Sequence, residues 1–119
     1  MSRIEELNAV TLVTTDMERS LAFYLALGFE VRDGRESPEF CSLAAGPGHL
    51  NLQLVPGYRP PAEVWGRVIL WVDDVDAVHG SAVDAGYRPS TRPEDAPWGE
   101  RYFHISDPDG HELSFAAPL

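Results

Sequence analysis

"VTLVTTDMERSLAFYLALGFEV", residues 10–31, is matched by "VILWVDDVDAVHGSAVDAGYRP", residues 68–89. Each stretch opens with the β-branched and aromatic residues typical of a strand, passes an acidic residue, and continues into a helix-like segment. Each then closes on a glycine followed by an aromatic residue. Twelve residues separate Asp16 from Gly28, and twelve separate Asp74 from Gly86, so the two copies are offset by 58 positions. Such a repeat predicts a duplicated structural unit.

Both copies carry signals for where a helix begins and which side it buries. Thr15 and Glu18 fit a capping box, in which the hydroxyl accepts from a first-turn amide and the carboxylate reaches back. In the second copy, Asp73 or Asp74 can cap the helix. Apolar residues then recur on one helical face. They are Met17, Leu21, Tyr24 and Leu25 in the first copy and Val75, Val78 and Ala82 in the second.

Three further strands are predicted after each helix, separated by turns that contain Gly and Pro. They are "FEVRD" (29–33), "FCSLAA" (40–45) and "HLNLQLV" (49–55), then "YRPS" (87–90), "ERYFHIS" (100–106) and "HELSFA" (111–116). The sequence therefore predicts one α+β domain, residues 1–119, made of two βαβββ modules at 6–56 and 65–117, with a Pro-rich linker at 56–64. We expect cupped mixed or antiparallel sheets, helices on the outer face and a concave inner face.

Composition narrows the class of protein. Nine basic residues against nineteen acidic ones give a net charge of −10, and no basic patch that would indicate a nucleic-acid partner is visible. An acidic surface could favour a cationic ligand, or serve solubility alone. The apolar runs are too short to span a membrane, and the start lacks a signal-peptide pattern. The only cysteine, Cys41, allows no intrachain disulfide, which favours a cytoplasmic location.

The segment "DPDGHELSF", residues 107–115, predicts a tight turn followed by a half-buried strand. In the turn, Pro presets φ and Asp-Gly closes the hairpin. The segment also resembles the start of a calcium loop, but the twelfth residue is Pro118 instead of the glutamate that such a loop needs. His49 and His111 flank turns, and we expect both to be exposed.

The duplicated pattern resembles the vicinal oxygen chelate superfamily, which includes glyoxalase I, extradiol dioxygenases, fosfomycin-resistance enzymes and bleomycin-resistance binding proteins. The resemblance rests on "TDMERSLAFYLALGFEV" (15–31), "VDDVDAVHGSAVDAG" (72–86) and "ISDPDGHELSF" (105–115), and covers nearly the whole chain. It implies cupped sheets around a small-molecule site and, for small members, a homodimer. Because this scaffold supports many chemistries, function must come from the site itself.

Catalytic members of the superfamily hold a divalent metal with His or Glu on the first and last strands of each half. The matching positions here are Ala9, Arg67, Ser114 and either Gln53 or, if the alignment slips by one pleat, Asn51. Alanine offers no ligand atom, and arginine brings a fixed positive charge. Gln and Ser are weak neutral ligands. We therefore expect no metal and no other cofactor.

Alternation along the strands predicts which side chains face the cup. They include Asn51, Gln53, Arg67, Ile69, Trp71, Tyr102, His104, Glu112 and Ser114, whereas Phe103, Ile105, Leu113 and Phe115 face the core. Trp71 can instead be core, or stack on a ligand. Arg67 can pair with Glu112 or contact a ligand. His104 can be structural or a base, and Trp98 can be a lid or a loop anchor.

Three functions remain open at this stage. The first is a metal-free binding protein that sequesters a small aromatic ligand in the concave cavity, with the cup residues and Trp98 as its contacts. The second is a metal-independent lyase or isomerase with Glu112 or His104 as acid or base and Arg67 stabilising an anion. The third is a metalloenzyme with relocated ligands such as His104 and Glu112.

Overall fold

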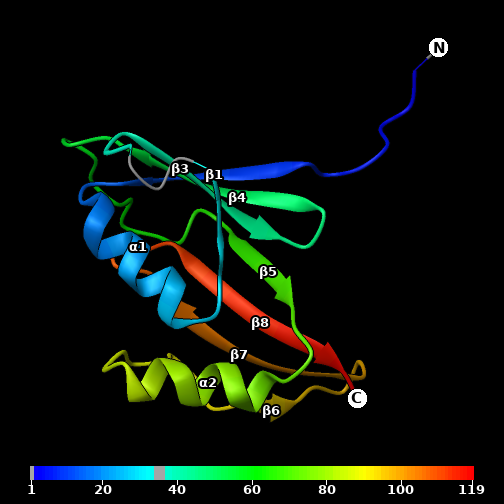
Figure 1. Ribbon diagram of the computed structural model, residues 1–119. Helices are drawn as coiled ribbons and strands as arrows, with labels where there is room; N and C mark the ends of the chain where they lie inside the picture. The colour runs from blue at the N-terminus through cyan, green and yellow to red at the C-terminus, as the bar shows by residue number, and fades with distance from the viewer. Residues whose placement is uncertain (1, 34–36) are drawn as a thin grey trace.

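Two four-stranded sheets, each covered by one helix, form the protein. Figure 1 shows the computed structural model, which describes residues 2–33 and 37–119. Module one contains β1 (Ala9–Thr14), α1 (Met17–Ala26), β2 (Val31–Asp33), β3 (Phe40–Ala45) and β4 (Gly48–Leu54). Module two contains β5 (Arg67–Trp71), α2 (Val75–Asp84), β6 (Glu94–Asp95), β7 (Glu100–Ser106) and β8 (Glu112–Pro118). The strand orders are β1-β4-β3-β2 and β5-β8-β7-β6, which confirms the predicted α+β fold of two βαβββ units.

The second strand of module two was placed wrongly by the sequence. Residues 87–90 form no strand, and the strand is instead the short β6, which pairs antiparallel with β7. Pro89 lacks an amide donor and fixes φ, so this stretch cannot form a regular ladder. The backbone amides of Ser90 and Thr91 nevertheless both donate to the carbonyl oxygen of His104, which keeps the segment beside β7.

The start of α1 also differs from the predicted capping box. Asp16 is the N-cap, and its side chain accepts from the amide of Arg19 at 3.1 Å. Thr15 cannot cap because its amide and hydroxyl both donate to Asp109, at 3.1 and 2.9 Å. In α2 the choice between two aspartates falls on Asp74, whose side chain accepts from the amide of Ala77 at 3.0 Å.

A single hydrophobic core lies between the helices and one face of each sheet. Its buried members include Leu12, Phe23, Tyr24, Leu43, Leu50, Leu52, Phe103, Ile105, Leu113 and Phe115. The core positions predicted on β7 and β8, which are Phe103, Ile105, Leu113 and Phe115, are thus confirmed. Edge-to-face contacts between aromatic rings join the core of one module to that of the other. The ring centroids of Phe23 and Tyr87 are 4.9 Å apart, and those of Phe29 and Phe115 are 6.3 Å apart. The opposite, concave face of each sheet is left for the site.

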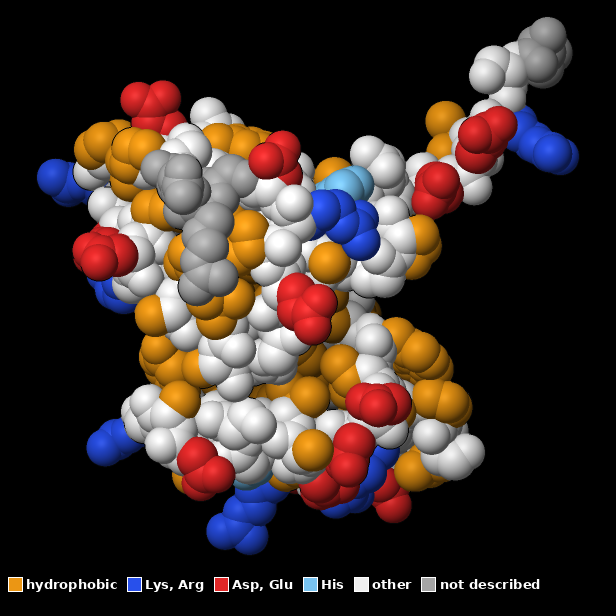
Figure 2. Space-filling view, in the orientation of Figure 1, with side chains coloured by type: hydrophobic (Ala, Val, Ile, Leu, Met, Phe, Trp, Pro, Cys, Tyr) orange, Lys and Arg blue, Asp and Glu red, His pale blue; other side chains and the backbone are white. Residues whose placement is uncertain are grey.

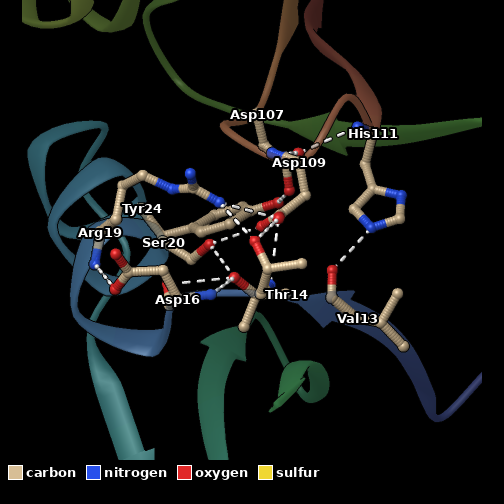
Figure 3. Close-up of polar contacts among 10 residues, drawn as sticks. Val13, Thr14, Asp16, Arg19, Ser20, Tyr24, Asp107, Asp109 and His111 are labelled. Atoms are coloured by element: carbon tan, nitrogen blue, oxygen red, sulfur yellow. Dashed lines mark hydrogen bonds and ion pairs between the residues drawn. The ribbon is translucent and has the colours of Figure 1, made fainter. Parts of the chain in front are cut away.

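A polar cluster also joins the modules, and we call it the inter-module clasp. It consists of Asp107 and Asp109 in the β7–β8 turn with Thr15, just before α1, and Arg19, Ser20 and Tyr24 on α1 (Figure 3). Asp109 Oδ1 accepts from Thr15 and from Arg19 Nη2 at 2.8 Å, and Asp109 Oδ2 accepts from Ser20 at 3.0 Å. The Tyr24 hydroxyl donates to Asp107 Oδ2 at 2.7 Å. The predicted turn is therefore also the contact between two distant parts of the chain.

The expectation that His111 is exposed was wrong. Only 4% of this residue is accessible, because it lies between the modules beside the clasp. Nε2 lies 2.8 Å from the carbonyl oxygen of Val13, as Figure 3 shows, and Nδ1 accepts from the indole nitrogen of Trp65 at 3.1 Å. A carbonyl can only accept, so Nε2 must carry the proton and the imidazole is neutral with both nitrogens satisfied. His111 is a structural residue.

Candidate ligand-binding face

The concave side of module two carries most of the residues that the sequence predicted for the site. We call it the aromatic face, and its members are Arg67, Ile69, Trp71, Trp98, Tyr102, His104, Glu112 and Ser114. The strand register brings them together: β5 runs parallel to β8 with Arg67 opposite Glu112, and β7 runs antiparallel to β8 with His104 opposite Ser114. Side chains two apart on a strand share one face, so the alternation read from the sequence is the physical cause of this grouping.

Aromatic side chains stand in the open on this face. Trp71 is 60% exposed, which excludes the alternative that it is packed under a helix. Trp98 is 68% exposed and stacks on Tyr102, with ring centroids 6.0 Å apart and planes 24° apart. Ser114 and Ala116, in the strand between, are small and buried beneath their neighbours. The flat, accessible rings around a floor of small residues can receive a planar ligand.

A tight turn held by hydrogen bonds presents Trp98, whose ring is exposed beside Tyr102. Gly99 adopts φ +93°, which other residues rarely tolerate, and its amide donates to the carbonyl oxygen of Ala96 at 3.1 Å. Arg101 secures the same hairpin by donating to Asp95 at 2.8 Å and to both oxygens of Asp76 on α2. The turn therefore holds the indole in place against Tyr102.

Arg67 and Glu112 form the ion pair that the sequence left as one of two options. Arg67 Nη2 donates to Glu112 Oε2 at 3.1 Å. The side chains are 41% and 17% exposed, so the guanidinium is only partly buried. A guanidinium has five N–H donors, and this contact uses one of its nitrogens. The rest of the group remains accessible to a ligand, so pairing and ligand contact are compatible.

His104 is a neutral imidazole on the same face. Burial lowers its pKa, the positive charge of Arg67 lowers it further, and the negative charge of Glu112 partly opposes both effects. Its ring lies 5.0 Å from that of Tyr102. The backbone on either side is fixed, because the amide of His104 donates to the hydroxyl of Thr91 at 3.0 Å. The ring is therefore held beside the aromatic cluster without a positive charge at neutral pH.

The concave side of module one has the same geometry and different chemistry. Thr11 lies opposite Asn51 on β4, which in turn lies opposite Ser42 on β3. Asn51 donates to the Thr11 hydroxyl at 3.3 Å. The strand register makes Asn51, instead of Gln53, the counterpart of Ser114. Asn51 lies opposite Thr11 on β1, and Ser114 lies opposite Ile69, which is the equivalent residue of β5. This face offers hydrogen bonds where module two offers rings.

The residues at the superfamily's metal positions do not suit a metal ion. In register terms they are Ala9, Asn51, Arg67 and Ser114, and the guanidinium of Arg67 already pairs with the nearest carboxylate. Within residues 2–33 and 37–119, no three His, Cys, Asp or Glu side chains form a group that could hold a metal ion. A divalent cation would also be repelled by the fixed charge of Arg67.

A cleft of about 470 Å³ lies beside the aromatic face, between the modules. It runs along β5, whose outer edge pairs with no described strand, and includes Ile69 and Trp71. Opposite them lie Leu7, Val10 and Phe29 from module one. In Figure 2 hydrophobic side chains fill the waist between the upper and lower parts of the molecule. The aromatic face thus continues into an apolar hollow.

Comparisons with known proteins agree with this architecture. The model of the Glyoxalase/Bleomycin resistance protein/Dioxygenase superfamily matches residues 6–115, and the chain belongs to that superfamily. A bleomycin resistance determinant encoded on transposon Tn5 is 25% identical, with a TM-score of 0.77 over 96% of this chain and 98% of that one. A bleomycin-binding protein complexed with bleomycin is 24% identical, with a TM-score of 0.74 over 98% of this chain and all of that one.

A sequence relative covers less. Uncharacterized protein Mb0911c of Mycobacterium bovis is 44% identical over 50 residues, which are 42% of this chain and 33% of that protein. No helix in the described part of the chain is long and apolar enough to cross a membrane. The family match and the structural likeness therefore agree on the fold of this superfamily.

Sequence reasoning missed two residues of the site region. Ile69 was placed toward the cup but not singled out, although it is 63% exposed beside Trp71. Arg101 had no motif, and its role in holding the Trp98 turn depends on Asp76, 25 positions away. The alternation of β5 could have flagged Ile69. Nothing in the sequence alone could have paired Arg101 with α2.

Proposed function

We propose that the protein binds a small aromatic ligand on the aromatic face, without a metal ion. The observation that carries this proposal is the exposure of Trp71 and Trp98 beside Tyr102 on one concave surface. Large apolar rings left in water are unfavourable unless something covers them. A planar ligand stacked on these rings would bury them, and Ser114 would lie beneath it as a hydrogen-bonding group, while Asn51 and Gln53 would offer hydrogen bonds on the concave face of module one. Arg67 and Glu112 would contact its polar groups.

Metal independence is supported by the chemistry of the family positions, where Arg67 places a positive charge. The expected result is that the protein purifies without a stoichiometric transition metal from metal-supplemented medium. Elemental analysis after dialysis measures this. About one equivalent of zinc, nickel, manganese or iron would contradict the proposal and favour relocated ligands such as His104 and Glu112.

A second copy of the chain is proposed to close the cavity. Each concave face is open on one side, and Ile69 and Trp71 along β5 are more than half exposed. Ile4 and Leu7, in the extended segment before β1, are 92% and 80% exposed, and that segment projects away from the rest of the protein in Figure 1. Oligomers usually pair such surfaces around a two-fold axis. Light scattering showing a species near 13.2 kDa at micromolar concentration would oppose a homodimer.

Indole N–H resonances in a two-dimensional NMR spectrum test ligand binding directly. Titration with a panel of planar heteroaromatic compounds should shift the signals of Trp71 and Trp98. The signal of Trp65 serves as an internal control, because its indole nitrogen is held by His111. Equal shifts of all three indoles, or shifts confined to Trp65, would contradict a site on the aromatic face.

A metal-independent lyase or isomerase is the second candidate. It is favoured by one observation: a neutral His104 shares the face with Glu112 and Arg67, as an acid–base pair with an anion stabiliser would require. Glu112 Oε2 already accepts a hydrogen bond from Arg67. Exchange of an acidic C–H of a bound ligand with solvent deuterium would support catalysis. The absence of exchange in a ligand that binds would leave the binding function.

A further inference from the structure

The starting observation is one unsatisfied atom on the aromatic face. Within residues 2–33 and 37–119, Nδ1 of His104 is the only buried side-chain nitrogen or oxygen that lacks a hydrogen-bond partner. Nε2 of the same ring has no hydrogen-bond partner among the described residues and is not fully buried, so it is accessible to solvent or to a ligand. The two nitrogens of one imidazole therefore meet opposite conditions. In the neutral ring one of them is a donor and the other an acceptor.

Burial decides which nitrogen carries the proton. An enclosed N–H without an acceptor is among the rarest and most costly groups in folded proteins, whereas an enclosed acceptor without a donor is tolerated more often. A proton on Nε2 can be solvated, or can bond to a ligand, and leaves only a bare lone pair at Nδ1. The Nε2–H tautomer is thus favoured, and the ring points a donor at the face.

The side chain of Arg67 also presents hydrogen-bond donors on this face. Arg67 is 41% exposed and has unused N–H donors directed from the same sheet face. Glu112, which is 17% exposed, is the carboxylate next to Arg67, and its Oε2 is engaged by that residue. The register also puts Glu94 and Glu100 on this face, but at its other end, next to Tyr102. The donors of His104 and Arg67 therefore lie together at the end of the face away from these two carboxylates.

We propose that His104 Nε2–H and Arg67 together select aromatic ligands that bear a hydrogen-bond acceptor, best of all an anionic one such as an aryl carboxylate, over aromatic amines. This inference rests on the proposed function and adds the class of ligand to it. It also gives His104 the role of a specificity-determining donor instead of a base, since a nitrogen that carries the proton cannot take one from a ligand.

The tautomer can be measured without any ligand. Long-range ¹H–¹⁵N correlation spectra at pH 8 should show a pyrrole-type nitrogen at Nε2 of His104 and a pyridine-type nitrogen at Nδ1. The ring is neutral at this pH because its pKa lies below the usual 6.5. A pyrrole-type signal at Nδ1 would overturn the inference.

Three probes with one ring test the selectivity: naphthalene-2-carboxylate, 2-naphthylmethylammonium and 2-methylnaphthalene. Calorimetry should show the carboxylate bound about tenfold more tightly than the ammonium, as expected for a hydrogen bond to a charged group. His104→Phe should lower the ratio of carboxylate to 2-methylnaphthalene affinity about tenfold, while His104→Gln, which keeps an N–H donor, should restore most of it. Circular dichroism confirms that both variants are folded.

The outcomes separate the two proposals. If 2-methylnaphthalene binds but the ammonium is preferred, or if His104→Phe leaves the ratio unchanged, the inference about ligand class is wrong and the aromatic site stands. If none of the three probes binds, the proposed function fails, and the ligand class falls with it. Preference for the carboxylate that depends on His104 and is rescued by glutamine supports both.

Discussion

The inter-module clasp lies in the turn between β7 and β8, and the aromatic face lies largely on those strands. The polar groups of the two regions differ in burial and in hydrogen bonding. In the clasp, Asp109 is 5% exposed and accepts four hydrogen bonds from the start of α1. On the aromatic face, tryptophans stand in the open and His104 Nδ1 has no partner. Satisfied and buried polar groups hold a fold together, while open rings and unused donors await a ligand. The comparison thus separates the residues of stability from those of binding.

The duplication sharpens the point, because the clasp exists on one side only. At the offset of 58, Ser20 and Tyr24 of α1 correspond to Val78 and Ala82 of α2, which have no hydroxyl. The β3–β4 turn, at Ala45–Gly48, likewise has no aspartate. The two modules therefore share a strand order, and the polar contact between modules is made by α1 and the β7–β8 turn.

The largest expected effect is on the clasp. Asp109→Ala leaves the amide and hydroxyl of Thr15, the hydroxyl of Ser20 and the guanidinium of Arg19 without their acceptor. The free energy of unfolding should fall by about 3 kcal/mol. Urea unfolding followed by circular dichroism measures it, and Asp84→Ala, at an exposed position of α2, is the matched control. Equal losses in both variants would mean that the clasp contributes nothing to holding the modules.

Tyr24→Phe should have a smaller effect on stability. It removes one buried hydroxyl that donates to Asp107 at 2.7 Å and keeps the ring contact with Phe23. The expected loss is about 1–2 kcal/mol in the same unfolding assay. Phe23→Leu, which alters packing without touching the clasp, provides a comparison at the adjacent core position. A loss near zero for Tyr24→Phe would show that water replaces the hydroxyl.

The two clasp carboxyl groups should respond to pH in opposite directions. Burial raises the pKa of Asp107 above 3.8, so its contribution to stability is lost as pH rises from 3.8 through the raised value. Burial also acts on Asp109, but hydroxyl and amide donors outweigh it and lower the pKa. Its contribution is therefore present above 3.8 and lost as pH falls through the lowered value.

Unfolding at a series of pH values measures these slopes. Asp107→Asn should flatten the change in stability above pH 3.8, and Asp109→Asn should flatten the change below it. If neither substitution alters the slope, the two groups titrate alike in the folded and unfolded chains, and the clasp has no special electrostatics.

On the aromatic face, Arg67→Met should change stability by about 1 kcal/mol or less, because the ion pair with Glu112 is partly exposed. Binding of naphthalene-2-carboxylate should weaken about tenfold, because a charge-assisted contact is lost. Calorimetry and urea unfolding on the same preparation give both numbers. A loss of stability as large as that of Asp109→Ala would show that Arg67 has mainly a structural role.

The smallest effect on stability is expected for Trp71→Ala. A side chain that is 60% exposed leaves little cavity when it is removed, so the loss should be within about 1 kcal/mol. Affinity for 2-methylnaphthalene should fall about tenfold as the stacking surface disappears. Val83→Ala, which shortens an exposed apolar residue of α2, should change neither quantity. Unaltered affinity in Trp71→Ala would remove the ring from the site.

Much of the fold followed from the sequence because its signals are local. The repeat from Asp16 to Gly28 and from Asp74 to Gly86 fixed two strand–helix units, and period-two alternation placed Phe103 and Ile105 in the core. A local pattern gave a wrong prediction where a residue distant in sequence bonds to the same groups. Thr15 fits a local capping pattern, but its amide and hydroxyl donate to Asp109, and Asp16 caps the helix instead.

The sequence by itself determined the duplicated α+β architecture, the family, and which side chains of β5, β7 and β8 share a face, because periodicity follows from backbone geometry alone. Only the tertiary structure decided that the "DPDG" turn clasps α1, that His111 is buried, and that Trp71 is open while Arg67 is paired. Each of these depends on contacts between residues tens of positions apart. Such contacts depend on how the two modules pack against each other, and this packing cannot be read from the sequence pattern of either module alone.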